Sequence, residues 1–118
     1  MAALESIDPS TGRVFARYER HSWPEIDARL ERAAAGFADW RDTDFAERAA
    51  RLRAIAARLR ERAPTIAELL AAEMGKPRAQ GHAEAEKCAA VCDYYATHAA
   101  TFLQPQTIES DAASSRVA

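Results

Sequence analysis

The sequence has few of the features that mark several common protein classes. It contains no run of about 18 apolar residues, the length that a helix needs to cross a bilayer. The first twenty residues carry charged side chains, such as Glu5, Asp8 and Arg13, and no apolar block, so we expect no signal peptide. Two cysteines are too few for a disulfide framework. These absences predict a cytoplasmic protein without a membrane partner.

Phosphate-binding and nucleic-acid-binding signatures are also missing. The four glycines are scattered along the chain and form no phosphate-binding loop. The net charge is −2, whereas a general nucleic-acid binder is basic. Arginines do gather between residues 48 and 62, but few aromatic side chains accompany them. We interpret this stretch as a solvated or interface face and predict no nucleic-acid partner.

The chain is poor in large apolar side chains. Of its 118 residues, 29 are Ala and only 19 are Leu, Ile, Val or Phe. That share is about 16%, below the ~20% at which an independent core becomes doubtful. The small net charge and the many good helix formers nevertheless argue against disorder. The composition therefore predicts a helical chain that packs on something outside itself.

Both ends of the chain have patterns typical of short β-ribbons. Residues 8–12, DPSTG, combine a proline that presets φ with three other strong turn formers. Short stretches of strand-like residues flank this turn, so residues 4–20 predict a β-hairpin. Residues 106–118 are typical of one strand, a polar turn and the opening of a second strand.

Between these ribbons, the spacing of apolar residues predicts helices over residues 22–103. The first helix follows Ser22, with Glu25 placed to complete a capping box, and the second follows Asp44 in the same relation to Glu47. We expect Pro64 to end the second helix, because proline cannot occupy a helix interior without a kink. A third helix should then run to a C-cap at residue 75, and a fourth should cover residues 78–103.

The expected buried faces follow from helical periodicity. They comprise Ile26, Leu30, Ala33, Phe37 and Trp40 in the first helix, Phe45, Ala49, Leu52, Ala56 and Leu59 in the second, Ile66, Leu69, Leu70 and Met74 in the third, and Cys88, Val91, Tyr95, Ala99 and Phe102 in the fourth. The many alanines on the other faces of the fourth helix are small enough to let another backbone approach closely.

Candidate chemistry in the sequence is sparse. Cys88 and Cys92, with His82 and His98, offer metal-ligand types, but no second ligand pair has zinc-site spacing, so we predict two buried structural cysteines. The carboxylates nearest a histidine are Glu73, Glu84 and Glu86. Nothing in the sequence selects a pair of them for acid–base chemistry, and we interpret them as solvated surface groups.

Four parts of the sequence resemble NAD(P)-dependent aldehyde dehydrogenases. Residues 7–12, IDPSTG, resemble the opening hairpin turn of that family, and residues 45–48, FAER, resemble the start of its second helix. Residues 73–77, EMGKP, resemble its most recognisable early motif. Residues 84–88, EAEKC, together with residues 91–96, VCDYYA, resemble the long helix that follows. Within the family, the sequence is most similar to bacterial succinate-semialdehyde dehydrogenases.

This resemblance implies a fold and a chemistry. The fold is the N-terminal part of the α/β aldehyde dehydrogenase fold, with a β-hairpin at residues 4–20, a helical layer at residues 22–103 and the start of an oligomerisation ribbon at residues 106–118. In the family, a cysteine thiolate attacks an aldehyde, a hydride passes to NAD(P)+, and a glutamate-activated water hydrolyses the resulting thioester. An Asn side chain and a backbone N–H stabilise the oxyanion.

In the family, those catalytic and cofactor-binding groups lie in segments that follow the ones matched here. We therefore expect an incomplete N-terminal fragment with no catalytic, cofactor-binding or metal-binding residue, in which neither Cys88 nor Cys92 is the nucleophile. The fragment should bind no cofactor, whereas the full-length family uses NAD or NADP. Its expected partners are the remainder of the fold and, in the full-length family, further copies in a homo-oligomer. The alternative is a small helical protein-interaction module without catalytic activity.

Overall fold

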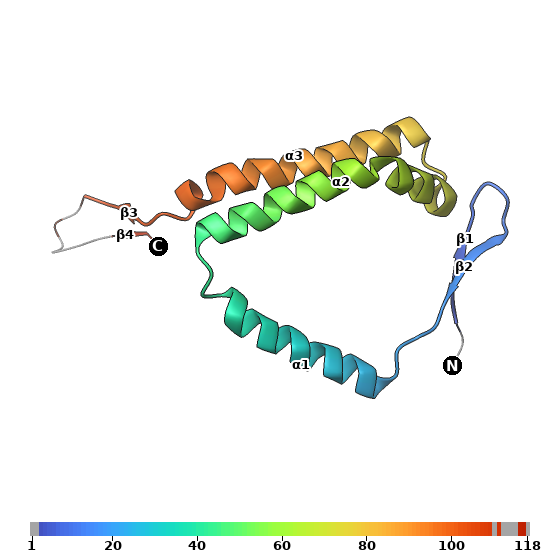
Figure 1. Cartoon of the computed structure of the whole chain (residues 1–118), viewed down its shortest axis with the longest axis horizontal. Coiled ribbons are helices and arrows are strands. Elements are labelled where there is room, and N and C mark those ends of the chain that lie inside the picture. Colours follow the sequence, from blue (N-terminus) through green and yellow to red (C-terminus); the bar gives the residue numbers. More distant parts are fainter. Residues whose placement is uncertain (1–2, 110, 112–115, 118) are drawn as a thin grey trace.

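The computed structural model describes residues 3–109, 111 and 116–117, and it is mainly helical. Figure 1 shows, in chain order, a β-hairpin, a helix that stands apart, a pair of long helices and a short second ribbon. The chain therefore has the predicted fold class, mostly α with a short N-terminal β-hairpin.

The N-terminal hairpin pairs β1 (Leu4–Ile7) with β2 (Val14–Tyr18) in antiparallel register. Ser6 pairs with Ala16 and Ile7 with Val14, so one residue of β2 bulges between these two pairs. In the turn, the Asp8 carboxylate accepts hydrogen bonds from the Ser10 backbone N–H at 2.8 Å and from the Ser10 hydroxyl at 2.6 Å. These bonds lower the pKa of Asp8 below its ordinary value. The predicted turn is thus held by its own side chains.

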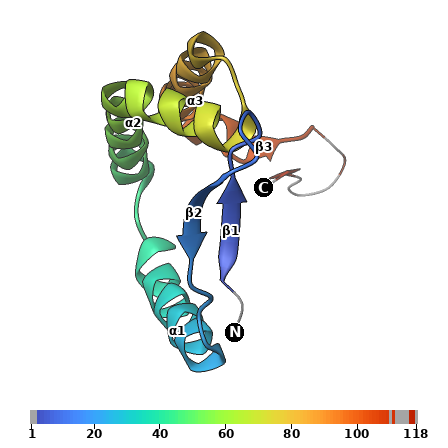
Figure 2. The same ribbon diagram turned by 90° about the vertical axis from the view of Figure 1, so that its right-hand side faces the viewer.

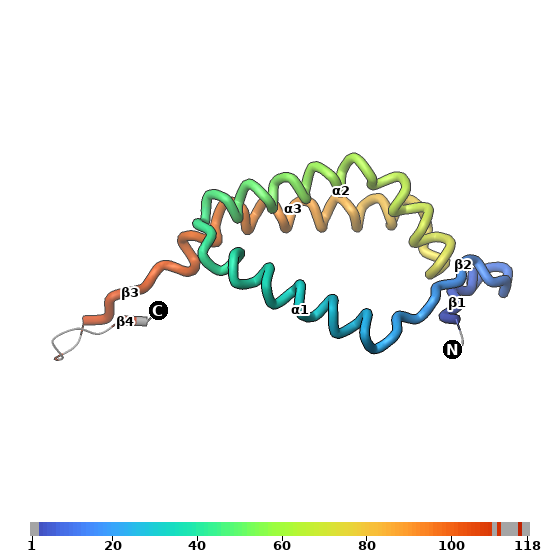
Figure 3. The backbone as a smooth tube through the Cα atoms, turned by 60° about the horizontal axis from the view of Figure 1, so that its bottom comes forward, coloured from blue at the N-terminus to red at the C-terminus, as the bar shows by residue number. Residues whose placement is uncertain are grey.

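Helix α1 (Trp23–Trp40) begins at the predicted cap but leaves its apolar face exposed. The Glu25 carboxylate accepts hydrogen bonds from the Ser22 backbone N–H at 2.7 Å and from the Ser22 hydroxyl at 2.8 Å. Leu30 and Phe37 are each 63% exposed, because α1 lies away from the other helices in all three ribbon and tube views (Figures 1, 2 and 3). The periodicity of this helix was correctly predicted, whereas its burial was not.

Helix α2 (Phe45–Met74) is a single element where the sequence predicted two. Both ends of the helix are as predicted. At its N-terminus, the Asp44 carboxylate accepts a hydrogen bond of 2.7 Å from the Glu47 backbone N–H. At its C-terminus, Gly75 adopts the left-handed conformation, with φ 68°. The predicted break at Pro64 is wrong, since the helix continues through this residue. Figures 1 and 3 show that α2 instead bends along its length, and the missing proline N–H gives that bend a cause.

Helix α3 (Arg78–Phe102) packs along α2 through a face that the sequence analysis did not select. Val91, Tyr95 and Phe102 are about half exposed, so the predicted buried face is wrong. The buried face consists of Gly81, Ala85 and Ala89, which meet Ala56, Ala63 and Ala67 of α2. No large side chain in the described part of the chain is fully buried, because the two backbones are too close to leave room for one.

The backbones of α2 and α3 approach each other closely at Gly81. A Cβ atom built on this glycine would lie 2.9 Å from the Cα atom of Ala67 and 3.2 Å from its Cβ atom. Such distances are well inside van der Waals contact, so the backbone of α3 reaches this close to α2 only because residue 81 has no side chain. The expectation that small residues allow close backbone approach is confirmed, although they form the main contact of α3 and not a secondary face.

The C-terminal ribbon is short. Strand β3 (Gln106–Thr107) pairs antiparallel with β4 (Arg116–Val117), which confirms a strand followed by a returning strand. Most of the predicted turn between them lies outside the described residues. Among the residues that are described, no helix is long and apolar enough to cross a membrane.

The whole chain is far more extended than an independent domain of its size. Its radius of gyration is 21.0 Å, whereas a compact domain of this length has about 13–14 Å. Its accessible surface is 9593 Å², against about 6,300 Å² for a folded monomer of the same mass. The shortage of large aliphatic residues is consistent with this excess surface, because the described residues share a narrow helix–helix interface and form no layered core.

Adding a methyl group at two glycines should change stability in opposite directions. Gly81→Ala should lower the free energy of unfolding by about 1–3 kcal/mol, because the new Cβ forces α3 away from α2. Gly36→Ala is the matched control in the exposed helix α1, where a Cβ meets nothing within 4 Å. It should stabilise the helix by about 0.5–1 kcal/mol. Urea unfolding followed by circular dichroism measures both, and equal effects would contradict the close contact at residue 81.

The cap of α1 should weaken in acid. The two hydrogen bonds from Ser22, chiefly that of its backbone N–H, lower the pKa of Glu25 below its ordinary 4.5. A lowered folded-state pKa means that the cap contributes fully above pH 4.5 and is lost as the pH falls through the lower value. The amide chemical shift of Ser22 should therefore titrate with a midpoint below 4.5, and Glu25→Gln should abolish that titration. A midpoint at or above 4.5 in the unsubstituted chain would refute the cap.

Candidate functional site

The candidate metal ligands do not come together. Cys88 is exposed and Cys92 is half-buried, both as free thiols on α3, so the prediction of two buried structural cysteines is wrong for Cys88. His98 contacts aromatic rings, with its centroid 4.5 Å from that of Tyr94 and 5.9 Å from that of Phe102. Within the part of the chain that the structure describes, no three His, Cys, Asp or Glu side chains are placed to hold a metal ion.

The carboxylates singled out in the sequence all have structural partners. Glu73 accepts a hydrogen bond of 3.0 Å from the Ser6 hydroxyl, Glu84 forms an ion pair with Lys76, and Glu86 lies 3.4 Å from Arg60 Nε. Each contact joins two elements or two turns of the chain. These carboxylates therefore connect parts of the fold, and none of them faces another as an acid–base pair would.

Several side chains of the arginine-rich stretch of α2 also form ion pairs within the chain. Arg60 reaches across to α3, where Nη2 lies 2.8 Å from an Asp93 oxygen. This hydrogen bond, with the nearby charges of Asp93 and Glu86, raises the pKa of Arg60. Arg51 and Arg58 pair with Glu47 and Glu61 along the helix itself. The face is a solvated and helix-bridging one, in agreement with the sequence interpretation.

Side-chain carboxylates cap two of the helix N-termini, which are common anion sites. The Glu25 carboxylate sits at the first turn of α1 and the Asp44 carboxylate at that of α2. Each carboxylate accepts a hydrogen bond from one backbone N–H group near the start of its helix, and each adds negative charge where the helix dipole favours an anion. The N-cap of α3 is Pro77, whose side chain has no acceptor for the first backbone N–H groups of that helix.

Three of the four family-like segments meet at one end of the α2–α3 pair. The hairpin turn approaches the C-cap of α2, where a Cβ on Gly75 would lie 3.2 Å from Cγ of Pro9. The Ser6–Glu73 hydrogen bond joins the same two segments, and the Lys76–Glu84 pair joins the C-cap to the start of α3. The segments 7–12, 73–77 and 84–88 thus form one structural contact that fixes the hairpin to the helices.

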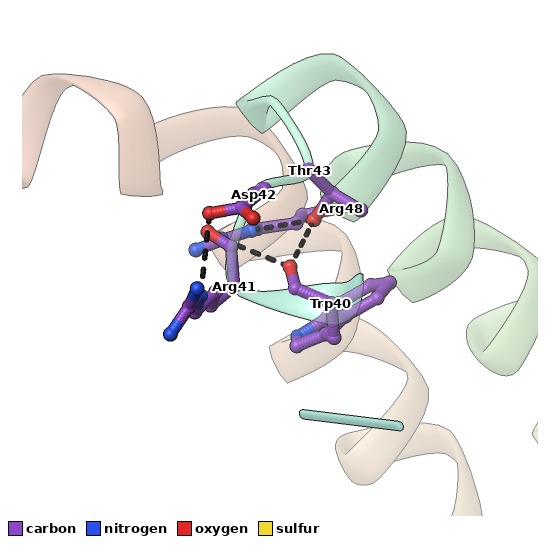
Figure 4. A network of polar contacts seen from close by, with 5 residues as sticks. All are labelled: Trp40, Arg41, Asp42, Thr43 and Arg48. Carbon is purple, nitrogen blue, oxygen red and sulfur yellow. Dashed lines mark hydrogen bonds and ion pairs between the residues drawn. The ribbon is translucent and has the colours of Figure 1, made fainter. Parts of the chain in front are cut away.

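The fourth segment, at the start of α2, fixes the corner between α1 and α2. Figure 4 shows the Arg48 side chain reaching back over residues 40–43. Its Nη2 atom donates to the carbonyls of Arg41 at 2.8 Å and Trp40 at 3.3 Å, and its Nε atom donates to the Thr43 hydroxyl at 3.0 Å. The guanidinium also lies 5.8 Å from the ring centroid of Trp40 and 6.0 Å from that of Phe45. We call these residues the Arg48 cluster.

A mostly apolar hollow of about 320 Å³ adjoins this corner, between the start of α2 and the end of α3. Trp40 and Phe45 line one side, and Tyr95 and Leu103 line the other. The hollow carries few polar atoms that could orient a substrate, so its chemistry suits an apolar side chain from another segment.

Sequence reasoning missed the contacts that hold these elements together. Arg48 was marked only as part of the family-like segment 45–48, and its contacts gave no signal, because its partners are mostly main-chain carbonyls, which every residue carries. The Arg60–Asp93 pair spans 33 residues and needs the helix pairing to be known first. A usable signal existed only at residue 81, where a glycine inside a long helical pattern indicates a close approach.

The four family-like segments and the fold together indicate the class of protein. The profile of the aldehyde dehydrogenase family matches residues 2–118, and the chain therefore belongs to that family. Among curated relatives, it is 40% identical over 110 residues to the NAD(P)+-linked succinate semialdehyde dehydrogenase Sad of Escherichia coli, a match covering 92% of this chain and 24% of Sad. It is 37% identical over 116 residues to a probable NADP+-linked succinate-semialdehyde dehydrogenase of Synechocystis, covering 98% and 26% of the two chains.

Solved structures give the same result. The succinic semialdehyde dehydrogenase of Streptococcus pyogenes, crystallised with NADP+, superposes with a TM-score of 0.87 at 31% identity. That match covers 95% of this chain and 25% of the Streptococcus chain. This chain thus spans about a quarter of the length of the relatives it matches.

The Arg48 cluster predicts how the corner responds to a conservative change. Arg48→Lys keeps the charge but cannot reproduce three hydrogen bonds from one planar group. At about 1 kcal/mol for each of the one or two bonds that lysine cannot replace, the corner should open more often and trypsin should cut after Arg41 about five- to thirtyfold faster. Arg53→Lys, an exposed change on the same helix, should leave that rate unchanged. Equal rates for both variants, measured by mass spectrometry, would contradict the assigned role.

Proposed function

We propose that this chain is the N-terminal part of an NAD(P)-dependent aldehyde dehydrogenase that oxidises succinate semialdehyde to the acid. The observation that carries the proposal is the match over nearly the whole chain to succinate-semialdehyde dehydrogenases from different bacteria. The interaction-module alternative is not favoured, because generic amphipathic helices do not account for four ordered family segments.

Within such an enzyme, this part serves a structural role. Among the described residues, neither free cysteine forms a hydrogen bond to a base, and carboxylates cap the starts of α1 and α2. We propose that cofactor binding and catalysis both reside in other segments of the enzyme. The extended helices and the hairpin form a layer whose exposed apolar faces pack on those segments.

The C-terminal ribbon has a separate proposed role. The β3–β4 pair extends beyond the end of α3, away from the hairpin (Figure 1). We propose that it begins an oligomerisation ribbon, since an exposed two-stranded edge readily pairs with a further strand. In this interpretation, a homo-oligomer forms only when the remaining strands of the ribbon are present.

Activity should depend on the rest of the fold. The 118-residue chain, purified and mixed with succinate semialdehyde and NADP+ or NAD+, should give no increase in absorbance at 340 nm. Joining it to the last three quarters of Escherichia coli Sad, in place of the matched segment, should restore NAD(P)+ reduction. A matched chimera with Gly81→Leu should lose activity together with its fold, because the α2–α3 contact is broken.

Two results would refute this proposal. Cofactor reduction by the 118-residue chain alone would show that it carries a catalytic site of its own. A chimera that is folded by circular dichroism but inactive towards all aldehydes tested would show that this chain does not replace the matched segment of Sad.

A further inference from the structure

The two cysteines of the chain open onto one hollow along α3. The hollow has a volume of about 610 Å³, and both thiols line it together with Glu84, Lys87 and Val91. Cys88 is exposed and Cys92 is half-buried, and both are free thiols. Because they are four residues apart, they lie one turn apart on the same side of the helix. The two sulfur atoms can therefore reach the same ligand.

The helical spacing suits a metal ion between the two sulfur atoms better than it suits a disulfide. Side chains four residues apart on a helix have Cβ atoms about 5–6 Å apart. A disulfide needs Cβ atoms about 3.5–4.5 Å apart, which regular helical backbone does not offer. With metal–sulfur distances of about 2.3 Å, an ion held between two opposed sulfur atoms separates them by about 4.6 Å. Rotation of the two side chains can reach this spacing while the helix stays intact.

The number of ligands selects the class of ion. In the part of the chain that the structure describes, no third His, Cys, Asp or Glu side chain joins the two cysteines, so the four ligands of a structural zinc site are not assembled. Soft thiolate ligands favour Cu(I), an ion that is stable with two ligands in a line. A pair of thiolates without further ligands therefore fits a soft ion that accepts two-coordinate geometry.

The charges around the hollow also favour such a complex. Thiols bind a metal ion as thiolates and release their protons, so Cu(I) and two thiols give two protons and a complex of net charge −1, with no transfer of electrons. The Lys87 side chain lines the same hollow and can offset this charge. The carboxylate that lines the hollow, Glu84, forms an ion pair with Lys76.

We propose that Cys88 and Cys92 form a two-coordinate thiolate site for a soft, thiophilic metal ion such as Cu(I). The sequence analysis predicted no metal site because a second ligand pair is missing, but a two-coordinate ion does not need one. The ion lies between the two sulfur atoms and requires no open face, so other segments of the enzyme can still pack on α3. This inference does not depend on the proposed enzymatic function.

Titration of the 118-residue chain with Cu(I) under anaerobic conditions, in competition with the chromophoric chelator bicinchoninate, tests the site. One ion should bind per chain, and X-ray absorption should show two sulfur neighbours. Cys88→Ser or Cys92→Ser should each weaken binding by about a hundredfold or more, because the second sulfur of an intact pair binds at a high effective concentration. Lys87→Glu should weaken it less, since the ligands are kept. Circular dichroism confirms that each variant keeps its helices.

A matched variant separates the paired geometry from the mere presence of two thiols. Cys92→Ala combined with Ala90→Cys keeps two cysteines but places them two residues apart, where side chains on a helix do not face each other. This variant should bind Cu(I) as weakly as the chains with one cysteine. The proposal is overturned if the two single changes leave the affinity unaltered, if the respaced pair binds as tightly as the original, or if sedimentation shows that two chains share one ion.

Discussion

The close contact between α2 and α3 is the interaction on which the rest of the structure depends. It consists of alanines and one glycine, so the two backbones approach nearly as closely as van der Waals contact permits. At one end of this pair the hairpin is attached through Ser6 and Pro9, and at the other end Arg48 fixes the direction of α1. Without the helix pair, neither attachment would have a rigid support.

Local features of the fold were predictable from the sequence because their causes are local. The Asp8 turn and the Ser22 and Asp44 caps arise from side chains within a few residues of the backbone that they stabilise, and the C-cap arises from the left-handed backbone of Gly75 itself. Family membership was also accessible, since short segments with the right order carry it. The absence of catalytic residues stays a prediction that the structure alone does not test.

The incorrect predictions for α3 and Pro64 share one physical origin. A helical periodicity shows which residues lie on one face, but it does not show what covers that face. On α3, the periodicity predicts that large residues such as Val91 and Tyr95 are buried, whereas the partner helix contacts the alanine face and leaves them exposed. At Pro64, one missing hydrogen bond was expected to end the helix, but packing of Ala63 and Ala67 on α3 carries the helix through.

The alanine contact also has a consequence for how this sequence can vary. Positions such as Ala63, Ala85 and Ala89 can lose a methyl group, but none can grow without separating the helices. The large apolar residues, in contrast, lie on outer faces, and their identity is constrained only by the segments that pack against them. Mutational drift at the helix pair is therefore confined to the smallest side chains, while the outer faces are free to change together with their partners. In this chain, one set of residues determines the stability of the helix pair, and a separate set determines how the outer faces pack against other segments.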